Sequence, residues 1–237
     1  MDIVLVHSSD LHVDDEILGT KHGSGTSGLA AVLAAARSHN ADIVLLAGDT
    51  FDNNRVPIPI IERAGRMMAE AGIPVVILPG NHDPALPNSV FHRGRYTEIP
   101  TVSIFGITHD QAAAFPAHDL EIWGHAHRDY ENMAPLRGPR ERTTRWQIAM
   151  AHGHYEPPHS LATPLRPSWL FTDEHITDTR ADYLALGHWD RPAQVGDGTV
   201  PAYYSGSPDL AQTVNVIRLR PSGEVLVSRE PLRWDSP

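Results

Sequence analysis

The sequence contains no cysteine, and it has no long uninterrupted run of apolar residues. The first absence excludes disulfide-stabilised scaffolds, zinc fingers, iron–sulfur clusters and cysteine nucleophiles. The second argues against a membrane partner, because a spanning helix needs about 20 apolar residues in succession. No basic or apolar leader precedes the strand-like start at residues 3–6, so we expect a cytoplasmic protein without a secretory signal.

Basic residues are also scarce relative to acidic ones. There are 19 of them against 29 acidic residues, which gives a formal net charge of −10. This balance argues against broad adhesion to nucleic acid, which requires a basic face. It does not exclude a nuclease whose carboxylates hold cations. Histidine is unusually common, with 15 copies, which raises the question of whether some of them bind metal.

The first half of the chain has the pattern of an α/β protein. Expected strands cover 2–7, 42–47 and 73–78, and expected helices lie around 29–36 and over 58–71. Strands that alternate with helices predict a parallel sheet. Further expected strands cover 101–106, 119–124, 146–151, 182–187, 200–205, 213–219 and 224–230, with a helix at 129–136.

Turn residues separate the last three of these strands, which suggests that they pair antiparallel. No linker, repeat or low-complexity segment interrupts the chain. We therefore predict a single domain over 1–237, in which two sheets pack together with helices outside. Little sequence follows the last polar motif except the closing strands, so we expect no separate capping domain.

Polar motifs follow five of the expected strands. They are Asp10-Leu11-His12, Gly48-Asp49-Thr50-Phe51-Asp52, Gly80-Asn81-His82-Asp83, His152-Gly153-His154 and Gly187-His188-Trp189-Asp190. Ligands of parallel α/β sheets bind at the carboxyl ends of the strands. Each motif alone is a weak signal, but chance assembly of all five is implausible. Mixed Asp, His and Asn ligands suit Mn²⁺, Fe or Zn²⁺, and a bridging carboxylate suits a two-metal site for displacement at phosphorus.

The series resembles the calcineurin-like metallophosphoesterase superfamily, whose signature is DxH, GDxxD, GNH(D/E), a lone His and then GHxH. The resemblance covers nearly the whole chain. The flanking residues, including Tyr204-Ser205-Gly206-Ser207-Pro208, are similar to the DNA-repair exonuclease branch. The resemblance to the superfamily implies a four-layer α/β/β/α sandwich of two mixed sheets and a site for two divalent metal ions, with Mn²⁺ preferred and Fe or Zn²⁺ as alternatives.

The resemblance also implies a role for each motif residue. Asp10 and His12 would hold the first metal, and Asp49 would bridge both. The second metal would be held by Asn81, His152 and His188. His82 would donate a proton to the leaving oxygen or stabilise the transition state, with Asp83 orienting it. Asp52 would support the site without binding metal.

Three features depart from the family pattern or lie beside it. Asp190 stands where the family has a second His, and we expect its carboxylate to complete the first metal site. Gly124-His125-Ala126-His127 matches GHxH literally but precedes His152, against the family order, so we interpret it as a strand end and surface loop. His154 is a candidate for contact with substrate.

The preferred functional hypothesis is hydrolysis of a phosphodiester by a metal-bridging water. The substrate would be a nucleotide, nucleic acid such as DNA, or a small phosphodiester. A phosphomonoesterase of the same fold is the first alternative, and a non-catalytic protein-binding scaffold is a further one. The sequence leaves the oligomeric state open.

Overall fold

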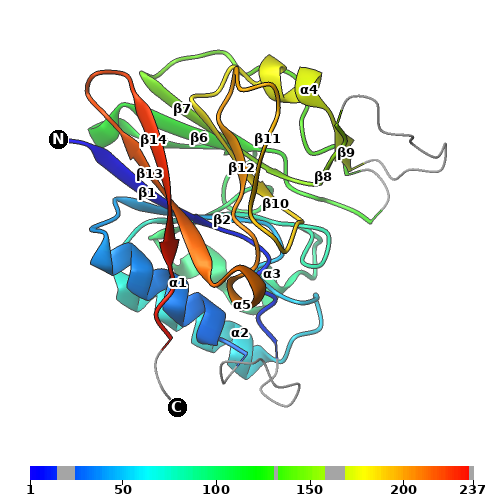
Figure 1. Cartoon of the computed structure of the whole chain (residues 1–237). Coiled ribbons are helices and arrows are strands. Elements are labelled where there is room, and N and C mark those ends of the chain that lie inside the picture. The colour runs from blue at the N-terminus through cyan, green and yellow to red at the C-terminus, as the bar shows by residue number, and fades with distance from the viewer. Residues whose placement is uncertain (15–24, 131–132, 158–168, 235–237) are drawn as a thin grey trace.

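The computed structural model describes residues 1–14, 25–130, 133–157 and 169–234. In these residues two six-stranded sheets lie against each other (Figure 1). The first sheet has the order β14-β13-β1-β2-β3-β4. Its strands are β1 (Ile3–Ser8), β2 (Ile43–Ala47), β3 (Val75–Leu78), β4 (Val102–Ile104), β13 (Thr213–Leu219) and β14 (Val225–Pro231). β1 to β4 run parallel, and β13 joins β1 antiparallel with β14 beyond it.

The second sheet has the order β11-β12-β10-β7-β6-β5. Its strands are β5 (Ala112–Phe115), β6 (Leu120–Gly124), β7 (Trp146–His152), β10 (Tyr183–Gly187), β11 (Ala193–Val195) and β12 (Ala202–Tyr204). The four central strands are parallel, and an antiparallel strand closes each edge. Two short strands, β8 (His154–Tyr155) and β9 (Leu170–Phe171), form a separate parallel pair.

Helices cover the outer faces. α1 (Ser27–Ser38) and α2 (Ile58–Ala71) lie side by side on the first sheet, with the short α3 (Val90–Arg93) and α5 (Pro208–Ala211) near them (Figure 1). α4 (Asp173–Asp178) lies against the outer face of the second sheet. Short 3₁₀ turns occupy Tyr96–Glu98 and Pro116–His118. No helix in the described part of the chain is long and apolar enough to cross a bilayer.

The parallel strands are apolar throughout because both of their faces are buried. In β2, Val44 and Leu46 pack toward the helices, whereas Ile43 and Leu45 pack between the two sheets. In β7, Ile148 faces the space between the sheets and the next residue faces the outer core. This alternation gives three apolar layers, which orient both sheets and so position the polar residues at the strand ends.

The predicted architecture of two mixed sheets flanked by helices is confirmed. The predicted grouping of the last three strands is wrong in part. β13 and β14 pair antiparallel as expected, but β12 belongs to the second sheet and runs parallel to β10. The turn after β12 therefore carries the chain from one sheet to the other, which local turn residues cannot reveal.

The predicted helix over 129–136 is also wrong, because its described residues are not helical. Pro135 cannot donate the hydrogen bond of a helix interior. The apolar side chains of Met133 and Leu136 are instead buried from an irregular segment. Strands β5 and β11 and helix α4 were not expected, since they are short and weakly patterned.

Candidate metal centre

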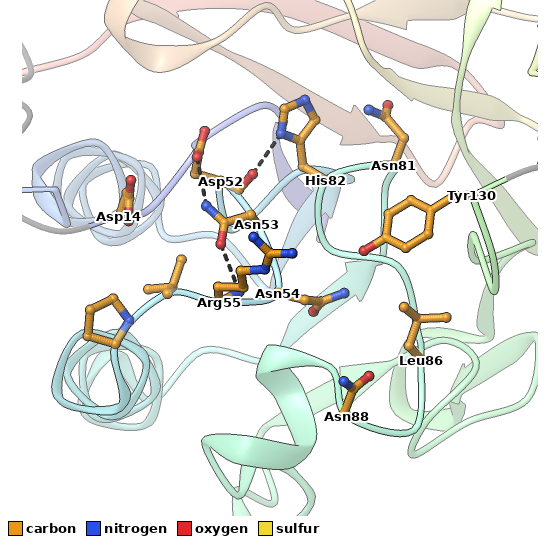
Figure 2. Close-up of a pocket in the computed structure, with 12 residues that line it drawn as sticks. Asp14, Asp52, Asn53, Asn54, Arg55, Asn81, His82, Leu86, Asn88 and Tyr130 are labelled. Carbon is orange, nitrogen blue, oxygen red and sulfur yellow. Dashed lines mark hydrogen bonds between the residues drawn. The ribbon is translucent and has the colours of Figure 1, made fainter.

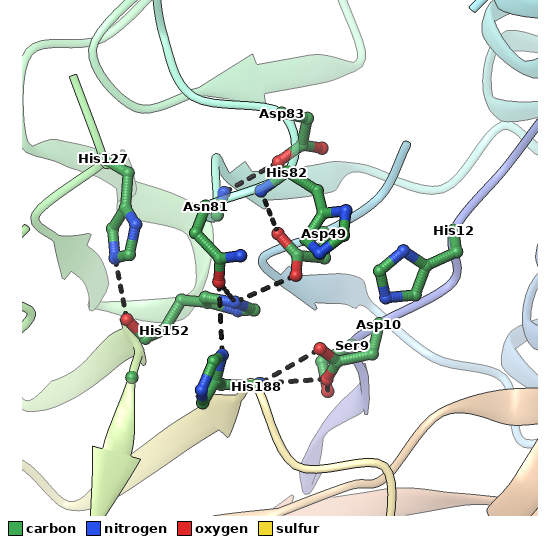
Figure 3. Close-up of polar contacts among 12 residues, drawn as sticks. Ser9, Asp10, His12, Asp49, Asn81, His82, Asp83, His127, His152 and His188 are labelled. Atoms are coloured by element: carbon green, nitrogen blue, oxygen red, sulfur yellow. Dashed lines mark hydrogen bonds and ion pairs between the residues drawn. The ribbon is translucent and has the colours of Figure 1, made fainter. Parts of the chain in front are cut away.

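The carboxyl ends of the central strands in both sheets meet at one edge of the molecule. An open cavity of about 970 Å³ adjoins this edge, with Asn81 and His82 in its lining (Figure 2). The predicted motifs lie beside it, and Figure 3 shows how their side chains point toward one another. The motif residues therefore form a single site next to a space large enough for a ligand.

Four predicted ligands of the second metal converge in the structure. The Nε2 atom of His152 lies 2.9 Å from Asn81 Oδ1 and 3.2 Å from Asp49 Oδ2. The Nδ1 atom of His188 lies 3.2 Å from the same Asn81 oxygen (Figure 3). The His152 ring is held in place by its Nδ1, which donates to the Ala47 carbonyl at 2.9 Å. Two oxygens and two ring nitrogens thus lie in one series of close contacts.

The predicted ligands of the first metal form an adjoining group. Asp10, His12 and Asp49 each offer a ligand atom, and these atoms lie within 4.8 Å of one another. The Asp10 carboxylate is positioned by Ser9 Oγ, which donates to it at 2.5 Å, and by the His188 amide at 3.0 Å. Asp49 belongs to both groups, as a bridging ligand would.

Burial is the largest single influence on the pKa values of the centre, and the charges within it oppose or add to that effect. Burial lowers the pKa of His152, but the charge and hydrogen bond of Asp49, together with the Asp10 charge and the Ala47 carbonyl, outweigh burial and raise that pKa to about 9. Burial raises the pKa of Asp49, but the His152 charge and hydrogen bond hold it well below its usual range. Burial raises the pKa of Asp10, against the opposing effects of His152 and of the hydrogen bond from Ser9. The centre therefore concentrates buried carboxylates that need a compensating positive charge.

This donor set fits divalent cations. Carboxylate and amide oxygens with imidazole nitrogens suit Mn²⁺, Fe or Zn²⁺. The two groups share Asp49, so two ions held by them would be bridged by one carboxylate. Cations there would offset the negative charge of Asp10 and Asp49, which are 4% and 2% exposed.

Several of the predicted ligand residues have strained backbone. Asp10, His12 and Asp49 have φ values of 54°, 45° and 50°, and His188 has a φ of 103°. Non-glycine residues in this region cost about 1–3 kcal/mol each and persist where the surrounding structure holds them. Sharp turns directly after the strands direct these side chains toward the centre, which accounts for the concentration of strain here.

Glycines give the ligands the space that they occupy. A Cβ on Gly80 would collide with the Asp49 side chain and backbone, and a Cβ on Gly48 would collide with the His152 ring. The glycines that open the GDxxD and GNHD motifs are therefore needed for close approach of the chain to the ligands.

His82 lies at the cavity side of the first group. Its Nδ1 donates to the Asp52 carbonyl at 2.7 Å, which leaves Nε2 for proton exchange. Its backbone amide donates to Asp49 Oδ1 at 2.9 Å. The His12 and His82 rings meet edge to face with centroids 4.7 Å apart, and Asp52 Oδ1 lies 3.3 Å from His12 Nδ1. Asp52 therefore supports both histidines, one through its carbonyl and one through its carboxylate.

We expected Asp83 to orient the His82 ring, but its carboxylate contacts two backbone amides. Its carboxylate accepts hydrogen bonds from the backbone amides of Gly80 at 2.7 Å and Phe51 at 3.0 Å. Burial, followed by the nearby charge of Asp49, raises the pKa of Asp83 to about 6. Asp83 thus braces the loops after β2 and β3 against each other, and the group hydrogen-bonded to the His82 ring is the Asp52 carbonyl.

Comparison with known proteins agrees with this geometry. The family model described as calcineurin-like phosphoesterase matches residues 3–192. The chain belongs to the calcineurin-like phosphoesterase family. Membership supports hydrolysis of a phosphoester as the chemistry of the site, and the donor groups described above agree with the family's use of divalent metal ions.

The chain is also similar to an uncharacterized metallophosphoesterase of Bacillus subtilis, YhaO. The two are 26% identical over 208 residues, an alignment that covers 79% of this chain and 48% of the relative. The chain therefore spans about half the length of that relative.

Solved structures share the fold. TT1561 of Thermus thermophilus has a TM-score of 0.60 at 12% identity, over 96% of this chain and 99% of that one. A putative 5′-nucleotidase from Staphylococcus aureus has a TM-score of 0.62 at 12% identity, over 100% of this chain and 55% of that one.

Two residues that we predicted to belong to the site, Asp190 and His154, lie at its border. Asp190 is exposed, and its carboxylate is outside the ligand groups found among the described residues. Its role as a ligand stays a prediction. His154 is half-buried, accepts a hydrogen bond from Trp189 Nε1 at 3.0 Å, and has its ring centroid 6.1 Å from that of His188. Its contact with substrate also stays a prediction.

His127 is the residue that sequence reasoning misjudged. We expected a surface loop there, but the side chain is 1% exposed. Its Nε2 donates to the His152 carbonyl at 2.8 Å, and the two rings meet edge to face. Burial lowers the pKa of His127 to about 3, so the ring is neutral. The signal that could have found it was the GHxH pattern itself, which follows the strand adjacent to β7 in the sheet.

Proposed function

We propose that the chain is a metal-dependent phosphodiesterase that uses two divalent ions, with Mn²⁺ as the preferred metal. The observation that carries the proposal is the convergence of Asp49, Asn81, His152 and His188 next to the group of Asp10 and His12. When bound, such ions stabilise charge on phosphoryl oxygens and lower the pKa of water. The large cavity beside His82 favours a diester, because it leaves room for a second ester group.

The chain's own residues supply positioning and proton transfer. In the hydrolysis, the oxygen of a water molecule forms a bond to phosphorus as the bond from phosphorus to the leaving alcohol breaks. His82 lies at the cavity side of the ligands, where it can donate its Nε2 proton to the departing oxygen. The Asp52 carbonyl holds the opposite nitrogen, so the ring keeps one orientation. A proton from the water restores His82.

The first test uses chelator-stripped protein with bis(p-nitrophenyl) phosphate and the monoester p-nitrophenyl phosphate, each with and without Mn²⁺. We expect Mn²⁺-dependent turnover of the diester. Turnover of the monoester alone would assign a phosphomonoesterase instead. Absence of turnover of both, with Mn²⁺ shown to bind, would favour a non-catalytic scaffold.

A second experiment tests the proton donor. His82→Ala should lower kcat about 10²- to 10⁴-fold for a diester with an alkyl leaving group. The loss should be much smaller for bis(p-nitrophenyl) phosphate, because p-nitrophenolate leaves without protonation. Mn²⁺ binding, measured by calorimetry, should persist in the variant. Equal losses for both diesters would contradict the assignment of His82 as the acid.

A further inference from the structure

The cavity beside the metal centre is much larger than a phosphate group needs. Its volume of about 970 Å³ falls in the range of sites that enclose drug-sized ligands. Asn81 and His82 line it and also belong to the centre, so the cavity is continuous with the place where a phosphoryl group would react (Figure 2). Because His82 marks the leaving side of the proposed reaction, this space would receive the leaving group.

One wall of the cavity offers a flat aromatic surface. The side chain of Tyr130 is 57% exposed, and its ring projects into the space between Asn81 and Leu86 (Figure 2). Exposed aromatic rings in nucleic-acid-binding grooves serve as platforms on which bases stack. A flat ring of the ligand could lie against Tyr130 while its ester oxygen faces His82.

The charges of the described lining residues select against a polyanion. Asp14 and Asp52 are acidic, and Arg55 is the one arginine or lysine among the described residues of the lining. The remaining polar residues of the lining are mainly asparagines. Asn88 presents an exposed amide, which can exchange hydrogen bonds with the edge of a base. A neutral, flat ligand suits this lining better than a long phosphate backbone does.

We propose that the cavity binds the leaving alcohol and that this alcohol is an uncharged nucleoside with its base stacked on Tyr130. The inference rests on the proposed function, whose substrate it narrows to diesters of a nucleoside. In the step, the water oxygen joins phosphorus and the bond from phosphorus to the nucleoside oxygen breaks. The proton of His82 goes to that oxygen, and a proton of the water returns to His82.

The test uses a mixed diester that carries adenosine on one side of phosphorus and methanol on the other. The cavity predicts release of adenosine with methyl phosphate at least tenfold over release of methanol with adenosine monophosphate. Tyr130→Ala should reduce this product ratio roughly tenfold, because it removes the stacking surface. Tyr130→Phe should preserve the ratio, since the ring remains.

Leu210→Ala is the matched control. Leu210 is 58% exposed, similar to Tyr130, but it lies on α5 and not in the cavity lining. It should leave the ratio unchanged. A product ratio near one in the wild type, or a ratio that Tyr130→Ala does not change, would overturn the inference about the cavity. Cleavage of either ester bond would still support the proposed phosphodiesterase function.

A binding measurement separates the two proposals if no bond is cleaved. Ligand-observed NMR would follow adenosine with Mn²⁺-loaded His82→Ala protein and with the same protein carrying Tyr130→Ala. If adenosine binds and Tyr130→Ala abolishes that binding, the cavity remains assigned as a nucleoside site even though the proposed hydrolysis has failed. Absence of adenosine binding would overturn it, as would tighter Tyr130-dependent binding of a ten-residue deoxyadenosine strand than of adenosine.

Discussion

At the scale of single residues, the metal centre depends on close approach between backbone and ligand side chains. Gly80 precedes Asn81 directly, and its Cα faces the Asp49 side chain with no room for a methyl group. Asp49 is shared by both ligand groups. Displacing it would therefore disturb both predicted metal positions at once.

We predict that Gly80→Ala lowers Mn²⁺ affinity at least about tenfold, because the added Cβ pushes Asp49 away from the position in which it faces His152. Isothermal titration calorimetry measures the affinity, and circular dichroism checks that the variant is folded. Gly28→Ala in α1 is the control, since its added Cβ would lie in ordinary contact, 3.5 Å from Pro208 Cβ. A folded Gly80→Ala protein with wild-type affinity would contradict the prediction.

At the scale of elements, a buried polar contact joins strands of the two sheets. His7 of β1 has its Nδ1 2.9 Å from the Tyr183 hydroxyl of β10. Asn215 of β13 places its Nδ2 3.4 Å from the same hydroxyl. All three side chains are at most 1% exposed. Burial lowers the pKa of His7 from 6.5 to about 3, so the native ring is neutral at every physiological pH.

This contact makes stability depend on pH. The unfolded chain binds a proton at His7 below a pH near 6.5, whereas the folded chain does not until about pH 3. The contribution of His7 to the free energy of unfolding is therefore fully present above about pH 6.5 and is lost as the pH falls below that value. Between pH 7.5 and 5.5 the loss should be about 1.4 kcal/mol.

Urea unfolding of metal-free wild type and His7→Gln at the two pH values tests this effect. The variant should be less stable overall, because it loses packing against Tyr183. Its free energy of unfolding should nevertheless fall by about 1.4 kcal/mol less than that of the wild type over the same interval. Equal falls in the two proteins would show that His7 does not titrate as its burial indicates.

At the scale of the whole molecule, the candidate metal centre joins the two sheets. Asp10, Asp49 and Asn81 follow strands of the first sheet, whereas in the second sheet His152 ends β7 and His188 follows β10. The complete donor set exists only when the sheets are packed. Metal binding should therefore stabilise the fold as a unit.

We expect Mn²⁺ at 100 times its Kd to stabilise the protein by about 2.7 kcal/mol. For a chain of this size, that corresponds to a rise in Tm of roughly 5–10 °C. Differential scanning calorimetry of stripped and Mn²⁺-loaded protein measures the shift. Asp49→Asn should show little or none of it. An unchanged Tm in a wild-type sample with bound Mn²⁺ would mean that the ions do not depend on the packed sheets.

Much of the site could be predicted because its residues follow strands directly. An apolar run that ends in Asp-x-His or Gly-Asn-His marks both the strand and the turn after it. The carboxyl ends of neighbouring parallel strands meet at one edge. Asp10, Asp49 and Asn81 therefore had to lie near one another once β1, β2 and β3 formed one parallel sheet.

The surroundings of the ligands could not be predicted in the same way. Asp83 and Asp52 lie on adjacent loops, and which of them contacts His82 depends on how those loops fold back. His127 looked exposed because a short polar loop surrounds it in sequence, yet it packs under His152. The contacts of Asp52 with His82 and of His127 with His152 join residues 30 and 25 positions apart, beyond the reach of local patterns.

The sequence by itself determined most of the strands, the parallel pairing within the first sheet and the chemistry of the donors, because hydrophobic periodicity and side-chain type are local properties. Only the tertiary structure decided that His152 and His188 of the second sheet meet Asp49 and Asn81 of the first. It also decided that β12 pairs with β10 and that Tyr130 faces the cavity. These arrangements depend on packing between distant segments, whose free energy comes from burying the apolar layer between the sheets.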